Sequence, residues 1–245
     1  MTRKVALVTG SATGIGRAVA VRFAKEGLAV AVNYSRSAKD AEETLAMVKS
    51  QGVPAILCQA NVADETAVAG MVRRCRDELG GLDVLVNNAG TTHFIDHKDL
   101  GALTGPVWDE IFNVNLKGTF FCCREAMPLL QERQGCIVNV TSVAGLQGHG
   151  SSIAYAASKA AVNCMTKSLA RAFGPKVRVN AVAPGPVLTR WLEGHMEHVQ
   201  KSVQITPMGR AADPDDIAQA IHFLALGTTL MTGQVVVVDG GRTIA

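Results

Sequence analysis

Tyr155 and Lys159 stand four residues apart in a stretch whose apolar spacing predicts a helix, so both side chains lie on one helix face. A phenol beside an ammonium is an acid/base pair, because the positive charge favours the phenolate. Free tyrosine ionises near pH 10, so its use near neutrality requires a pKa lower by about 3 units, or roughly 4 kcal/mol. One lysine is not expected to lower the tyrosine pKa by that amount. We therefore expect a second positive charge and a group that binds the substrate oxygen.

A nucleotide-binding turn is predicted near the start of the chain. An apolar strand over 4–9 runs into Gly10, Gly14 and Gly16, and a helical pattern and a second strand over 28–32 follow. The glycines let the backbone approach a pyrophosphate, and the helix N-terminus offers free N–H groups to hold it. The spacing G-x-x-x-G-x-G departs from the usual G-x-G-x-x-G, so this turn alone is equally compatible with a tight connection.

The rest of the chain alternates strands with helices. Helical periodicity covers 64–79 and 117–133, and further apolar strands are expected at 55–58, 83–87, 136–141, 177–182 and 234–238. This alternation predicts an α/β fold with a doubly wound parallel sheet and helices on both faces. With 245 residues, 48% of them hydrophobic, and no linker, we expect one domain over 1–245. Gly10, Asn87, Ser142 and Pro184 fall at strand ends, which predicts a site along one sheet edge.

These motifs together resemble the short-chain dehydrogenase/reductase family. The matching segments, in the order of the family and over nearly all of the chain, are Thr9-Gly10-x-x-x-Gly14-x-Gly16, Asn87-Asn88-Ala89-Gly90, Asn113-Val-Asn115, Ser142 with Tyr155-x-x-x-Lys159, and Pro184-Gly185. The resemblance implies a Rossmann-type fold and an oxidoreductase. Segments 32–36 and 180–185 are most similar to reductases of the 3-oxoacyl-(acyl-carrier-protein) type.

The resemblance implies catalytic roles for Asn115, Ser142, Tyr155 and Lys159. Tyr155 would be the general acid and Ser142 would hydrogen-bond the same substrate oxygen. Lys159 would lower the tyrosine pKa and hold the nicotinamide ribose, while oxidised nicotinamide supplies the second positive charge. Asn115 would hold a water that links Lys159 to solvent. Each residue taken alone also fits a structural role, such as a surface pair or a cap, and it is their joint order that favours catalysis.

The end of the second strand indicates the cofactor. NAD-binding proteins usually place a carboxylate there, whereas Tyr34, Ser35 and Arg36 offer hydroxyls and a guanidinium that suit a 2′-phosphate. NADP(H) is therefore predicted, with NAD(H) as the alternative, although Thr13 stands where many NADP-preferring relatives carry a basic residue. The expected cofactor-binding residues are Gly10, Thr13, Gly14, Ile15, Gly16, Tyr34, Ser35, Arg36, Asn61, Val62, Asn88, Ala89, Gly90, Tyr155, Lys159, Pro184, Gly185, Val187 and Thr189.

The substrate is less well defined by the sequence. The resemblance places a substrate loop at about 186–207, where Val187, Leu188, Trp191, Leu192, His195, Met196 and Val199 predict an apolar wall or a lid. Segment 91–106 either lines the pocket entrance or is a solvated loop. We expect NADPH-dependent reduction of a ketone or 3-oxoacyl group. An NAD-dependent alcohol or sugar dehydrogenase and a non-catalytic nucleotide-binding protein remain as alternatives.

Composition limits the possible partners. The 24 basic and 21 acidic residues give a net charge of +3 without a basic run, so no nucleic-acid partner is expected. No apolar stretch reaches the length of a membrane span and no signal peptide is evident, which predicts a cytoplasmic protein without membrane contact. The six cysteines are expected to be reduced, and no metal site is predicted. By resemblance we expect a homotetramer, or a dimer, paired through helices near 117–133 and 153–173.

Overall fold

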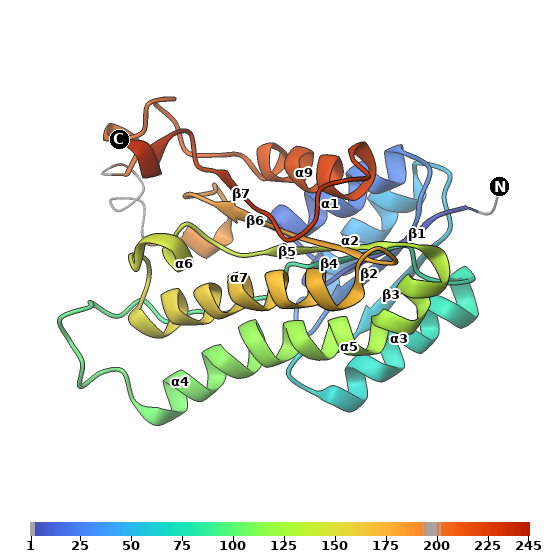
Figure 1. The fold of residues 1–245 in the computed structure, drawn as a ribbon, viewed down its shortest axis with the longest axis horizontal. Helices are drawn as coiled ribbons and strands as arrows, with labels where there is room; N and C mark the ends of the chain where they lie inside the picture. The colour runs from blue at the N-terminus through green and yellow to red at the C-terminus, as the bar shows by residue number, and fades with distance from the viewer. Residues whose placement is uncertain (1–2, 193, 195–199, 201) are drawn as a thin grey trace.

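A single parallel sheet organises the computed structural model, which describes residues 3–192, 194, 200 and 202–245. Seven strands hydrogen-bond in the order β3-β2-β1-β4-β5-β6-β7 (Figure 1). Their bounds are β1 Val5–Val8, β2 Ala29–Tyr34, β3 Ala55–Gln59, β4 Val84–Asn87, β5 Cys136–Val140, β6 Arg178–Pro184 and β7 Val235–Val238. The order reverses between β1 and β4, which creates the crevice where ligands of such sheets bind.

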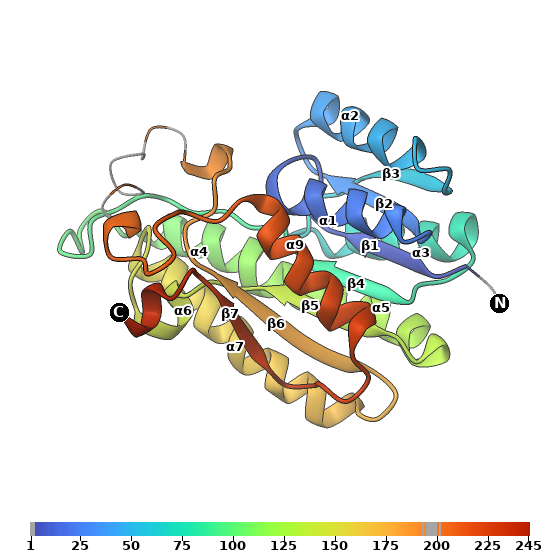
Figure 2. The ribbon, with the colours of Figure 1, turned by 90° about the horizontal axis from the view of Figure 1, so that it is seen from above.

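Helices cover both faces of the sheet (Figures 1 and 2). One face carries α1 (Gly14–Lys25), α2 (Ala38–Lys49) and α9 (Pro214–His222), and the other carries α3 (Glu65–Leu79), α5 (Thr119–Arg133) and α7 (Ile153–Phe173). Alternate residues of β1 serve the two cores, since Ala6 and Val8 pack on the α1 side and Val5 and Leu7 on the α3 side. The doubly wound α/β prediction is therefore confirmed.

Shorter elements complete the chain, and all except η3 lie toward the C-terminal ends of the strands. They are α4 (Gly105–Phe112), α6 (Ala144–Gln147), the π-helical η1 (Asn113–Gly118) and η3 (Phe223–Gly227), and the 3₁₀ turns η2 (Arg190–Leu192) and η4 (Arg242–Ile244). The helix expected at 117–133 thus begins with the last residues of a π turn. Thr119 Oγ1 donates to Asn115 O at 2.7 Å within this turn, and a Cβ on Gly118 would lie 2.7 Å from Val62 Cγ2. The wider turn therefore lets the helix pack closely beside Val62.

The cysteines belong to the packed interior with one exception. Cys58, Cys75, Cys122, Cys123 and Cys136 are buried, whereas Cys164 is exposed, and all six are free thiols. Burial raises the pKa of the Cys58 and Cys136 thiols to about 11, so both stay protonated near neutrality. In the described part of the chain, no helix combines the length and the apolar character that crossing a membrane requires.

Candidate active site

The glycine turn is held between β1 and β4 by amide side chains. Gly10 N donates to Asn33 Oδ1, and Asn88 Nδ2 donates to the carbonyl oxygens of Thr9 and Gly10, each at 2.9 Å. A Cβ on Gly16 would lie 2.5 Å from Gly10 O, so only glycine lets α1 begin this close to the turn. The α1 N-terminus therefore faces the crevice, as a pyrophosphate site requires.

A continuous cavity of about 1770 Å³ runs along this sheet edge. It extends from Ser35 and Arg36 at the end of β2, past the glycine turn, to Ser142 after β5 and Tyr155 on α7. Drug-sized ligands fill cavities of roughly 300–1,000 Å³. The larger volume is sufficient for a dinucleotide together with a substrate.

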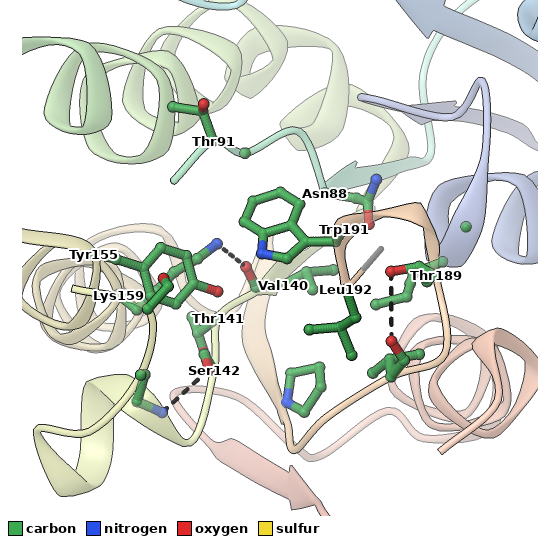
Figure 3. A pocket seen from close by; sticks show the side chains of 18 of the residues that line it. Asn88, Thr91, Val140, Thr141, Ser142, Tyr155, Lys159, Thr189, Trp191 and Leu192 are labelled. Atoms are coloured by element: carbon green, nitrogen blue, oxygen red, sulfur yellow. Dashed lines mark hydrogen bonds between the residues drawn. The ribbon is translucent and has the colours of Figure 1, made fainter. Parts of the chain in front are cut away.

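Three of the four predicted catalytic side chains, Ser142, Tyr155 and Lys159, converge at one end of the cavity (Figure 3). The Ser142 hydroxyl lies close enough to Tyr155 to lower the pKa of the phenol, and the Lys159 ammonium lies 5.7 Å from the centroid of the Tyr155 ring. Lys159 Nζ donates to Val140 O at 2.9 Å, which fixes the lysine against the end of β5. Hydroxyl, phenol and ammonium thus form one polar cluster at this end of the cavity.

Comparisons with known proteins agree with this geometry. A family model described as Enoyl-(Acyl carrier protein) reductase matches residues 10–243. A solved structure from Burkholderia xenovorans, described as a short-chain dehydrogenase/reductase, superposes with a TM-score of 0.95 at 35% identity and covers 100% of both chains. The chain belongs to the short-chain dehydrogenase/reductase family.

Sequence relatives of this short-chain dehydrogenase/reductase carry names that specify a reaction. A protein named as a ketoacyl reductase of the granaticin polyketide synthase of Streptomyces violaceoruber is 45% identical over 97% of this chain and 95% of its own length. A 3-oxoacyl-(acyl-carrier-protein) reductase of Staphylococcus aureus is 40% identical over 97% of both chains. The chain is an oxidoreductase of this family.

Burial sets the protonation of the two ionisable groups in the reductase. It raises the pKa of Tyr155 to about 12, and the hydrogen bond with Ser142 opposes that rise. Burial also lowers the pKa of Lys159 to about 8. The lowered tyrosine pKa expected from the sequence is therefore not found, because desolvation by burial outweighs the opposing effect of Ser142.

Asn115 lies behind the cavity wall. Its Nδ2 donates to Thr91 O and to Ser158 Oγ, each at 3.0 Å, and its Oδ1 accepts from Thr91 N at 2.8 Å. Through these hydrogen bonds, the Asn115 side chain connects the segment that follows β4 to α7. The Asn115 side-chain amide is therefore already hydrogen-bonded to Thr91 and Ser158. The predicted water would have to bind to the backbone of the residue instead.

Most predicted cofactor-binding residues line the cavity. They are Gly10, Thr13, Gly14, Ile15, Ser35, Arg36, Asn61, Val62, Asn88, Ala89, Gly90, Tyr155, Lys159, Pro184, Gly185, Val187 and Thr189. Gly16 and Tyr34 do not line it. Gly16 is packed behind the turn, and alternation along β2 directs Asn33 toward the turn and Tyr34 away from it.

Asn33 and Arg190 are site residues that the sequence did not single out. Asn33 Nδ2 also donates to Ala60 O at 3.0 Å, so one amide joins the glycine turn to the end of β3. Arg190 reaches the glycine turn through its guanidinium, which lies 3.2 Å from Thr13 Oγ1. Its position directly after Thr189, in the predicted substrate loop, was the only signal available.

The predicted substrate loop borders the cavity as expected. Trp191 and Leu192 extend into it, and the Trp191 ring lies 6.1 Å from that of Tyr155 (Figure 3). His195, Met196 and Val199 lie outside the described residues. Segment 91–106 also contributes to the wall through Thr91, Phe94, Ile95, Asp96 and His97. Among the residues that the structure describes, no group of three His, Cys, Asp or Glu side chains could hold a metal ion.

Proposed function

We propose that the enzyme reduces the ketone of a 3-oxoacyl thioester, or of a similar apolar ketone, to an alcohol with NADPH. The observation that carries this proposal is the placement of the Ser142 hydroxyl beside the Tyr155 phenol at the end of the cavity, with the Lys159 ammonium 5.7 Å from the centroid of the tyrosine ring. Two hydroxyl groups directed at one point suit a single oxygen that gains negative charge. The names of the relatives support an oxo group as its source.

In this proposal, the residues of the chain hold and move protons while bound NADPH supplies the hydride. Ser142 and Tyr155 donate hydrogen bonds to the carbonyl oxygen, which accepts the tyrosine proton as the hydride adds to the carbon. A tyrosine with a pKa of about 12 keeps its proton at neutral pH, so the free enzyme is already in the acid form that reduction requires. Lys159 stabilises the phenolate that remains and holds the ribose hydroxyls.

The remaining cavity walls suit an acyl chain. Trp191, Leu192 and Val187 supply apolar surface beside the tyrosine, and Phe94 and Ile95 supply it from segment 91–106. Gly90 lies beside the same end of the cavity, since its Cβ position is 3.7 Å from Lys159 Nζ and 3.6 Å from the Trp191 ring. Arg36 and Ser35, both exposed at the far end, would bind the 2′-phosphate.

Tyr155→Phe tests this proposal because it keeps the ring and removes the proton. We expect turnover of a 3-oxoacyl thioester to fall by about three orders of magnitude, with an NADPH Kd within twofold of the wild type. Initial rates of NADPH oxidation and fluorescence titration measure the two quantities. The matched 2-enoyl thioester should not be reduced by the wild type. Full activity in the variant would remove Tyr155 from the acid role, and preferential reduction of the enoyl substrate by the wild type would overturn the ketone assignment.

A further inference from the structure

Arg190 connects the loop that carries Trp191 to the cofactor half of the cavity. Its Nη2 donates to Thr13 Oγ1 in the glycine turn at 3.2 Å, and its Nη1 lies 3.1 Å from Asp40 Oδ2 in the first turn of α2. Thr13 lines the cavity, and Asp40 follows Arg36 by four residues. The guanidinium therefore lies where the glycine turn and the start of α2 come together.

The backbone that presents Arg190 is fixed on both sides. Val187 forms a parallel bridge with Ala212, and Leu188 N donates to Ala212 O at 2.8 Å. Thr189 packs on the glycine turn, since a Cβ on Gly14 would lie 3.1 Å from Thr189 Cγ2. Leu192 N closes the turn on Thr189 O at 3.0 Å. The backbone on either side of Arg190 is therefore held in place beside the α1 N-terminus.

Positive charge is sparse along the cavity. Among its described lining residues, the lysines and arginines are Arg36, Lys159, Arg190 and Arg242. Lys159 is bound to Val140 beneath the tyrosine, and Arg242 lies in η4 near the C-terminus. The adenosine half of the cavity therefore has Arg36 and Arg190 as its described cations, although the dinucleotide brings a diphosphate and a 2′-phosphate to it.

The bond between Arg190 and Asp40 is exchangeable. The two side chains are 50% and 29% exposed, and solvent screening leaves an ion pair of this kind little net stability. A phosphate offers a guanidinium more charge and a bidentate geometry. Without Arg190, the Asp40 carboxylate would stand uncompensated beside the glycine turn and repel that phosphate.

We propose that Arg190 is a cofactor-binding residue that exchanges Asp40 for a phosphate group of the dinucleotide. The inference rests on the NADPH dependence in the proposed function. In this proposal, Arg190 supplies the positive charge that many NADP-preferring relatives carry at the position of Thr13.

Fluorescence titration of the full chain with NADPH and with NADH tests the proposal without any substrate. We expect Arg190→Ala to weaken NADPH binding at least tenfold, as loss of a charged hydrogen-bond donor predicts. Asp40→Asn removes the competing charge and should leave the affinity unchanged or raise it. Arg22→Ala is the matched control, because Arg22 pairs with Asp215 at 2.7 Å between α1 and α9 and does not line the cavity.

The two cofactors identify the phosphate. A loss confined to NADPH assigns the 2′-phosphate, and an equal loss for NADPH and NADH assigns the diphosphate; both results support the proposal. Unchanged affinity for both cofactors in Arg190→Ala overturns it. Equal weakening by Arg190→Ala and Asp40→Asn also overturns it, because the pair would then act only as a structural link. Arg190→Gln, which keeps the length of the side chain, repeats the test if the alanine variant unfolds.

Failure of the proposed function would give a different result. If no ketone is reduced while the titrations behave as expected, the substrate assignment is wrong and the role of Arg190 stands. Arg36→Ala provides the reference for a lost 2′-phosphate contact in the same titration.

Discussion

At the scale of single residues, the site is an acid held in its protonated form by burial. Tyr155 has a pKa of about 12 and Lys159 one of about 8, and desolvation is the main cause of both shifts. Burial disfavours the charged form of each group, so it acts in opposite directions on an acid and a base. The lysine, and not the tyrosine, therefore titrates within the working pH range of the free enzyme.

The pH dependence of reduction follows from Lys159. Below about pH 8 the side chain is charged and able to stabilise the phenolate, and above that value it loses its proton. We expect kcat/KM for ketone reduction to fall about tenfold for each pH unit above 8, because kcat/KM reports groups of the free enzyme. Initial rates from pH 6 to 10 measure this, with the unfolding midpoint checked at each pH. A rate that stays constant to pH 10 would contradict the assignment.

At the scale of elements, the position of the catalytic lysine depends on the contact between α6 and α7. A Cβ on Gly145 would lie 2.6 Å from both Ala160 N and the carbonyl carbon of Lys159. Both are backbone atoms, so neither can turn aside as a side chain would. Gly145 therefore sets how closely the segment after Ser142 approaches the helix that carries Tyr155.

Gly145→Ala should move the two helices apart. We expect the free energy of unfolding to fall by about 1–3 kcal/mol, as overpacking usually costs. Turnover should fall by about 100-fold, because a displacement near 1 Å misaligns the catalytic groups. Urea unfolding and steady-state kinetics measure the two effects. Gly105→Ala is the control, since nothing lies within 4 Å of its Cβ position, and similar losses there would refute a specific packing role.

At the scale of the whole molecule, α5 presents an aromatic side chain to the surface. Phe120 is 43% exposed and lies next to Phe121, whose ring has the Arg124 guanidinium 5.4 Å above its centroid. The helix at 117–133 was one of the two predicted for pairing between subunits. Exposed aromatic and arginine side chains are typical of interface centres.

Phe120→Asp tests whether this face joins subunits. We expect the wild type to run as a tetramer in light scattering after size exclusion, and the variant to dissociate at least in part at micromolar concentration. Met47→Asp is the control, because Met47 on α2 is also 43% exposed. A wild-type monomer, or an oligomer that both variants leave intact, would show that α5 does not form the interface.

The sequence by itself determined the sheet and its site edge. Strands and helices appear within a few residues of their predicted positions, because buried parallel strands are continuous apolar runs and helices keep a 3.6-residue period. Gly10, Ser142 and Pro184 line the cavity at strand ends as predicted, whereas Asn87 is buried behind it and donates to Asn139 Oδ1. These features depend on local order along the chain.

Only the tertiary structure decided which side chains face the cavity and how they ionise. Alternation along β2 turned Asn33, and not Tyr34, toward the glycine turn, and the chain forms a π turn over Asn113–Gly118 ahead of α5. Arg190 reached the glycine turn across 177 positions of sequence, which no local pattern records. The pKa of Tyr155 rose because desolvation depends on every neighbour that excludes water, and the order of residues along one helix does not contain that information.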